Sequence, residues 1–107
     1  MKTMNPAVRI PEPDLAAFCS RWGVAEVELF GSALTPAFGP DSDIDLLVSP
    51  RPGTVWSLFE EVRMRDELAE LFGRPVDLLV RSAIERSSNW IRRAEILGSA
   101  TQIYAAR

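Results

Sequence analysis

Three aspartates stand where the sequence otherwise predicts apolar strands. Asp43 and Asp45 lie two residues apart at the start of the apolar stretch 44–48, and Asp77 lies inside the apolar run 75–80. Side chains two apart on a strand point to the same face, so Asp43 and Asp45 are expected to project together. We expect all three carboxylates to be buried or half-buried, which is costly unless a cation meets them. Lys2 is the only lysine, and a hard divalent cation such as Mg²⁺ suits oxygen ligands best.

A glycine and a serine precede the paired aspartates. Gly31-Ser32 ends the first predicted strand, and residues 33–42 separate it from Asp43. Glycine lets the backbone approach a phosphate, and a serine at the start of a short helix offers a hydroxyl and an amide to an anion. Asp43 and Asp45 would hold metal against that phosphate, and Asp77 would bind a second metal and draw the proton from an attacking hydroxyl. The pattern predicts metal-assisted phosphoryl-type transfer.

Composition excludes several other chemistries. The 107 residues contain no histidine and a single cysteine, Cys19, which excludes histidine bases, Ser-His-Asp triads and Cys/His zinc sites. A net charge of −3 argues against direct nucleic-acid binding through a basic face. No apolar run approaches the roughly 18 residues of a membrane span. We therefore expect one domain over residues 1–107, cytoplasmic and not bound to membranes.

The remaining pattern predicts an α/β (α+β) fold, a small mixed sheet flanked by helices. Helices are expected from residue 13 to Gly23, from a cap at Thr54 or Ser57 to Gly73, and over residues 89–97 before a break at Gly98. Strands are expected over residues 24–30, 44–48 and 76–80, with a short one over 101–104. The expected inward residues of the first two helices are Leu15, Phe18, Cys19 and Trp22, then Leu58, Val62, Leu68 and Phe72.

Three stretches together resemble the minimal nucleotidyltransferases of the DNA polymerase β superfamily, the MNT antitoxins of HEPN/MNT toxin–antitoxin pairs. The first is Leu29-Phe30-Gly31-Ser32 followed by Asp41-Ser42-Asp43-Ile44-Asp45-Leu46-Leu47-Val48. The others are Leu71-Phe72-Gly73-Arg74-Pro75-Val76-Asp77-Leu78-Leu79, and Ile91-Arg92-Arg93-Ala94-Glu95-Ile96-Leu97 with Ile103-Tyr104-Ala105. Gly-Ser-x10-Asp-x-Asp carries most of this resemblance.

The resemblance implies a polymerase-β-like core and a specific reaction. A hydroxyl, such as a tyrosine of the partner HEPN ribonuclease toxin, would attack the α-phosphate of ATP and keep AMP as pyrophosphate leaves. Asp43 and Asp45 would bridge two Mg²⁺ ions, and Asp77 would complete the second site and act as the base or beside it. Gly31 and Ser32 would hold the β- and γ-phosphates. The sequence leaves open whether the protein also forms a homo-oligomer.

The sequence departs from that family at one point. Many relatives carry a basic residue after Gly-Ser, whereas this chain continues Ala33-Leu34-Thr35-Pro36. Arg74 and Arg51 are candidates to replace the missing cation.

A different class of function stays open. The chain could be a catalytically weak interaction module that neutralises the toxin by binding, with Trp56, Trp90 and Tyr104 as interface anchors. The three acids favour the enzyme. A stand-alone antibiotic nucleotidyltransferase is disfavoured, because no residues remain to form a drug-binding domain.

Overall fold

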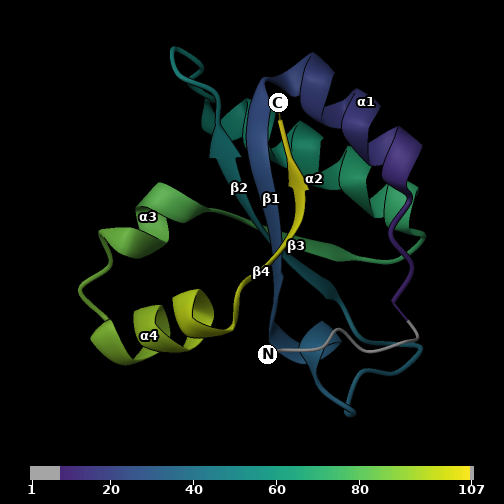
Figure 1. The fold of residues 1–107 in the computed structure, drawn as a ribbon, viewed down its shortest axis with the longest axis vertical. Helices are drawn as coiled ribbons and strands as arrows, with labels where there is room; N and C mark the ends of the chain where they lie inside the picture. Colours follow the sequence, from purple (N-terminus) through teal and green to yellow (C-terminus); the bar gives the residue numbers. More distant parts are fainter. Residues whose placement is uncertain (1–7, 107) are drawn as a thin grey trace.

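A four-stranded sheet in the order β3-β2-β1-β4 forms the centre of the molecule (Figure 1). The structure is a computed structural model that describes residues 8–106. The strands are β1 (Val24–Phe30), β2 (Ile44–Pro50), β3 (Val76–Val80) and β4 (Thr101–Ala105). Strand β1 pairs antiparallel with β2 and β4, while β2 pairs parallel with β3. The mixed sheet flanked by helices confirms the predicted fold class.

Helices cover the two faces of the sheet unequally (Figure 1). Helices α1 (Glu12–Trp22) and α2 (Leu58–Phe72) pack on one face and build the larger apolar cluster with β1 and β2. The short α3 (Arg81–Glu85) and α4 (Trp90–Ser99) pack on the other face. There the buried cluster is small: Phe30, Leu47, Ile84 and Ile96. A 3-10 helix, η1 (Gly31–Leu34), follows β1 directly.

The helix ends follow the expected local chemistry. Gly23 and Gly73 end α1 and α2 in the left-handed conformation, at φ 70° each. Ser57 caps α2 through a capping box, in which its side chain accepts from the Glu60 backbone and Glu60 accepts from the Ser57 backbone. The expected strand at 101–104 is present as β4.

The predicted inward face of α2 was partly wrong. Leu58 and Val62 are exposed, and Met64 is buried beside Leu68 instead. Val62 lies about 160° around the helix from Met64, because successive residues are about 100° apart. The inward face therefore follows Met64, Leu68, Leu71 and Phe72. Four exposed large apolar residues lie before and along the first turns of α2: Val55, Leu58, Phe59 and Val62.

Two element boundaries differ from the prediction, and one short helix was not predicted. Helix α4 continues through Gly98 to Ser99, because buried Ile96 holds this turn against the sheet and the Ala100 amide donates to Ile96 O at 3.0 Å. Strand β2 extends to Pro50, which pairs with Val24 beyond the end of β3. Helix α3 was missed because five residues give too little periodicity to detect. No helix within residues 8–106 is long and apolar enough to cross a membrane.

Candidate active site

The parallel pairing of β2 with β3 brings two of the predicted acids together. Asp45 is the register partner of Asp77, and Leu47 is the partner of Leu79 on the same face of the sheet. Ile44 points to the opposite face and is 1% exposed in the larger cluster. Adjacent strands are about 4.8 Å apart. The two carboxylates therefore project side by side toward the α4 face.

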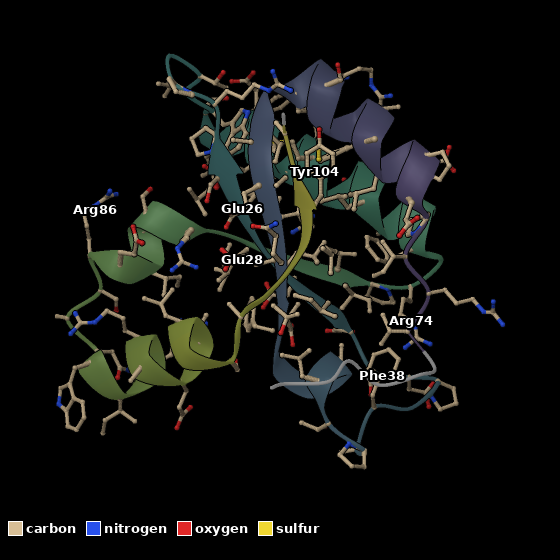
Figure 2. The ribbon with its side chains drawn as sticks, viewed as in Figure 1. Glu26, Glu28, Phe38, Arg74, Arg86 and Tyr104 are labelled. Carbon is tan, nitrogen blue, oxygen red and sulfur yellow. The ribbon has the colours of Figure 1, made fainter. Side chains whose placement is uncertain are left out.

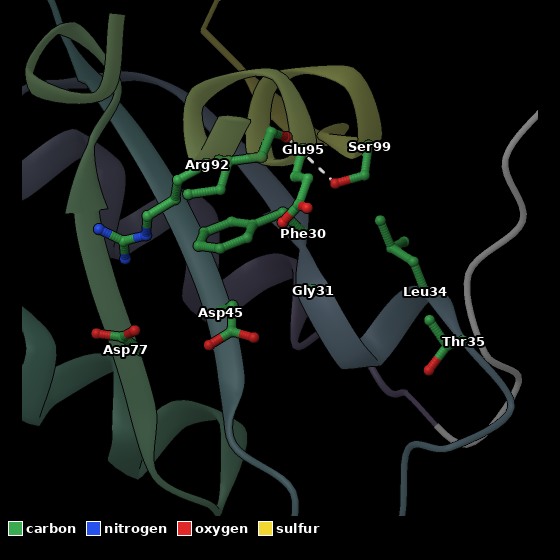
Figure 3. Close-up of a pocket in the computed structure, with 10 residues that line it drawn as sticks. Phe30, Gly31, Leu34, Thr35, Asp45, Asp77, Arg92, Glu95 and Ser99 are labelled. Carbon is green, nitrogen blue, oxygen red and sulfur yellow. Dashed lines mark hydrogen bonds between the residues drawn. The ribbon is translucent and has the colours of Figure 1, made fainter. Parts of the chain in front are cut away.

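A cavity of about 670 Å³ lies above these two carboxylates (Figure 3). Strands β1 to β3 form its floor, η1 forms one wall and α4 the roof. Its lining residues are Phe30, Gly31, Leu34, Thr35, Asp45, Asp77, Arg92, Glu95, Ile96 and Ser99. Apolar, carboxylate and cationic side chains thus share one space, as in sites that bind a polar small molecule.

Gly31 is held against the Asp45 carboxylate. Its φ is 77°, and a Cβ at this position would lie 2.2 Å from Asp45 Oδ2. The backbone N–H of Ser32 donates a hydrogen bond to the same carboxylate. The Ser32 amide thus serves the Asp45 carboxylate here, and its contact with a phosphate stays a prediction.

Negative charge is concentrated around Asp45. Burial raises the pKa of Asp45, the charges of Asp77 and Asp43 raise it further, and the Ser32 amide lowers it in part. Asp45 is half-buried as expected, but Asp43 and Asp77 are exposed, so the expectation that they are buried or half-buried was wrong. Asp43 precedes β2, and Asp77 lies on the edge strand β3, where its side chain meets the open cavity.

The acids fit a magnesium ion held jointly with a substrate. Within residues 8–106, no three Asp, Glu, Cys or His side chains are grouped closely enough to enclose a metal by themselves. Mg²⁺ commonly uses one or two carboxylates together with substrate phosphates. Asp45 and Asp77 supply such oxygen ligands at the cavity, with Asp43 close enough for its charge to act on Asp45.

The other residues named from the sequence have varied positions. Ser32 and Asp43 adjoin the site without lining the cavity. Trp56 is half-buried and its Nε1 donates to Trp22 O at 2.8 Å, which makes it part of the structural frame. Tyr104 packs against the larger cluster, while Trp90 is 66% exposed.

Sequence reasoning assigned no role to the residues that α4 adds to the cavity. They are Arg92, Glu95, Ile96 and Ser99. Their spacing of i, i+3, i+4 and i+7 is the one signal that could have placed them on a common helix face. Without the sheet topology, nothing in the sequence indicated what that face would cover.

Comparisons with known proteins show the family to which the chain belongs. The model of the nucleotidyltransferase domain family matches residues 15–100. Protein adenylyltransferase MntA of Thermococcus cleftensis is 34% identical over 65 residues, which cover 61% of this chain and 64% of that protein. The chain thus spans less than two-thirds of that curated relative.

Solved structures share the fold. A minimal nucleotidyltransferase matches with a TM-score of 0.62 and 30% identity, covering 85% of this chain and 86% of that one. A chain from the complex of tri-AMPylated Shewanella oneidensis HEPN toxin with MNT antitoxin matches with a TM-score of 0.61 and 18% identity, covering 90% and 71%. The fold expected from the resemblance is confirmed, and the chain belongs to the nucleotidyltransferase domain family.

Proposed function

We propose that the protein transfers AMP from ATP to a hydroxyl of a partner protein, using two Mg²⁺ ions. The observation that carries this proposal is the pairing of Asp45 with Asp77 beneath a cavity that is walled by Gly31. A triphosphate would be repelled by these carboxylates unless divalent cations accompany it. The ions would neutralise charge on the phosphate oxygens, and Asp43, Asp45 and Asp77 would be their protein ligands.

The chain's own residues would bind and orient the reactants. The Gly31-Ser32 turn would hold the β- and γ-phosphates through backbone amides and the Ser32 hydroxyl. The acceptor oxygen would bond to the α-phosphorus as the bond to the pyrophosphate oxygen breaks, and the electron pair would leave with pyrophosphate. Asp77, exposed at the cavity, would accept the hydroxyl proton.

The acceptor we propose is a HEPN-domain toxin, which makes this chain a cytoplasmic antitoxin. Two relatives support this choice by their own descriptions: one is named a protein adenylyltransferase, and the other is an MNT antitoxin bound to an AMPylated HEPN toxin. We propose tyrosine as the modified residue.

Intact-mass spectrometry tests this proposal. The protein is incubated with ATP, Mg²⁺ and the proposed HEPN-domain partner, and the mass of that partner is followed over time. The proposal expects steps of one AMP on the partner, which disappear with EDTA. An unchanged partner mass at complete complex formation would contradict it. Labelling of free aminoglycosides at a comparable rate would contradict the choice of a protein acceptor.

A second candidate function is neutralisation of the toxin by binding alone. The exposed apolar residues Val55, Leu58, Phe59 and Val62 favour a protein-binding surface beside α2. Trp90 is also exposed, on α4 at the other face of the sheet. The two functions differ in their need for nucleotide. If binding alone acts, the toxin stays inhibited without ATP and its mass does not change.

A further inference from the structure

Neither arginine suggested from the sequence as a phosphate-binding cation lies at the cavity. Arg74 donates from Nη1 to Gly39 O at 3.0 Å and to Ser42 O at 2.9 Å. Its guanidinium also lies 4.4 Å from the centre of the Phe38 ring (Figure 2). Arg74 therefore holds the loop that leads to Asp43. Arg51 follows β2 at the strand end remote from Asp45 and does not line the cavity.

Arg92 is the basic side chain that the structure places at the cavity within residues 8–106. Its guanidinium has no ion pair or hydrogen bond in this part of the chain, so it is available to a ligand. Asn89 caps α4 by accepting from the Arg92 backbone at 3.1 Å. One turn later, buried Ile96 fixes the rotation of the helix against the sheet. Packing thus places Arg92, whose side chain is exposed, on the face of α4 that covers the cavity.

The position of Arg92 relative to the acids indicates which phosphate it would meet. In Figure 3 its guanidinium lies on the β3 side of the cavity, the side of Asp77, whereas Gly31 lies on the far side of Asp45. In phosphoryl transfer the attacking and leaving oxygens are roughly in line. If Gly31-Ser32 holds the departing pyrophosphate, the α-phosphorus and the acceptor face the Asp77 side. Arg92 is the available cation on that side.

We propose that Arg92 is a further substrate-binding and catalytic residue, which contacts the α-phosphoryl group of the nucleotide as that group is transferred. This inference rests on the proposed function. The guanidinium donates to non-bridging oxygens of the α-phosphate and offsets part of the charge of Asp45, Asp77 and Glu95 around it.

Three variants test this assignment with two readouts. Arg92→Ala is expected to bind Mg²⁺–ATP about tenfold more weakly by calorimetry, because one charge-assisted contact is lost, while Mg²⁺–pyrophosphate binds as in the wild type. The rate of AMP transfer is expected to fall about 100-fold or more. Arg92→Lys should recover part of the rate, since it keeps the charge without the planar fork. Arg86→Ala is the matched control, because Arg86 is exposed at the end of α3 and does not line the cavity (Figure 2).

The outcomes separate this inference from the proposed function. If the wild type transfers no AMP, the proposed function fails, and the comparison of ATP with pyrophosphate binding still decides the role of Arg92. Wild-type ATP affinity in Arg92→Ala would overturn the assignment to the α-phosphate. Equal weakening of ATP and pyrophosphate would also overturn it, because the contact would then lie on the leaving group.

Discussion

At the scale of single residues, the contact between Gly31 and Asp45 brings the Gly-Ser turn and the acids into one site. The glycine conformation, at φ 77°, brings the turn directly against the Asp45 carboxylate. The Ser32 amide then donates to that carboxylate. A ligand anion at this amide and a cation at Asp45 would therefore be immediate neighbours. The close approach of the turn to Asp45 is possible because Gly31 has no side chain.

Gly31→Ala is expected to destabilise the fold modestly and to abolish transfer. The left-handed conformation costs a non-glycine residue about 1–2 kcal/mol. The new Cβ would also turn the flexible Asp45 side chain away from its present position. Thermal unfolding and the AMP-transfer rate measure the two effects. Gly39→Ala is the control, since a Cβ there meets nothing within 4 Å. Wild-type transfer by a folded Gly31→Ala protein would show that the close approach is unnecessary.

At the scale of elements, an ion pair joins the central sheet to α3, the short helix that precedes α4. Glu28 on β1 is 7% exposed and accepts two hydrogen bonds from Arg81 Nη1 of α3, at 2.7 and 2.8 Å. Arg81 Nε also donates to Glu85 at 3.1 Å. Glu26 lies two residues before Glu28 on the same strand face (Figure 2). Burial raises the pKa of Glu26, and its hydrogen bond and charge interaction with Glu28 raise it further.

This glutamate pair predicts a pH dependence of stability. Since the pKa of Glu26 is raised in the folded state, the folded protein binds this proton more tightly than the unfolded chain. The free energy of unfolding should therefore fall as pH rises from the ordinary glutamate range through the raised Glu26 pKa. Glu26→Gln should flatten that decline in denaturant titrations at several pH values, whereas Glu70→Gln, on exposed α2 surface, should not. If the free energy of unfolding of Glu26→Gln falls with pH as steeply as that of the wild type, Glu26 does not cause the decline.

The rotation of α2 gives a second prediction at this scale. Met64→Ala is expected to cost about 2–5 kcal/mol, because Met64 is fully buried in the larger cluster. Val62→Ala should change stability by no more than about 0.5 kcal/mol, since Val62 is 40% exposed. Urea unfolding of the two variants measures both values. A reversal of this order would mean that α2 packs through the face first expected from the sequence.

The helices and strands differ in how far the sequence alone could predict them. Caps at Ser57, Gly23 and Gly73 and the apolar runs of β1 to β3 are local signals, so these elements were predicted closely. The burial of Asp77 was overestimated because a strand's apolar run does not show that the strand lies at the sheet edge. Arg92 was missed as a site residue for a similar reason. Its place over the acids depends on α4 crossing the sheet, which is a tertiary property.

At the scale of the whole molecule, the larger apolar cluster and the candidate active site lie on opposite faces of the sheet. The face under α1 and α2 is closed by the larger apolar cluster. The face under α3 and α4 has the small cluster and the open cavity. Loss of the acids should therefore leave the main core intact. The charges of Asp77 and Asp43 contribute to raising the pKa of Asp45, which means that the three carboxylates repel one another in the folded state. Replacing one of these aspartates by asparagine should therefore leave the melting temperature equal or higher near neutral pH.

Asp43 and Asp45 are expected to serve AMP transfer and not folding. The most direct test compares the wild type with the double variant Asp43→Asn/Asp45→Asn, by intact mass of the HEPN partner after incubation with Mg²⁺–ATP. Asp66→Asn, on exposed α2 surface, is the control. We predict AMP addition by the wild type and the control, and none by a double variant that melts no lower than the wild type. AMP addition at the wild-type rate by a folded double variant would contradict the account.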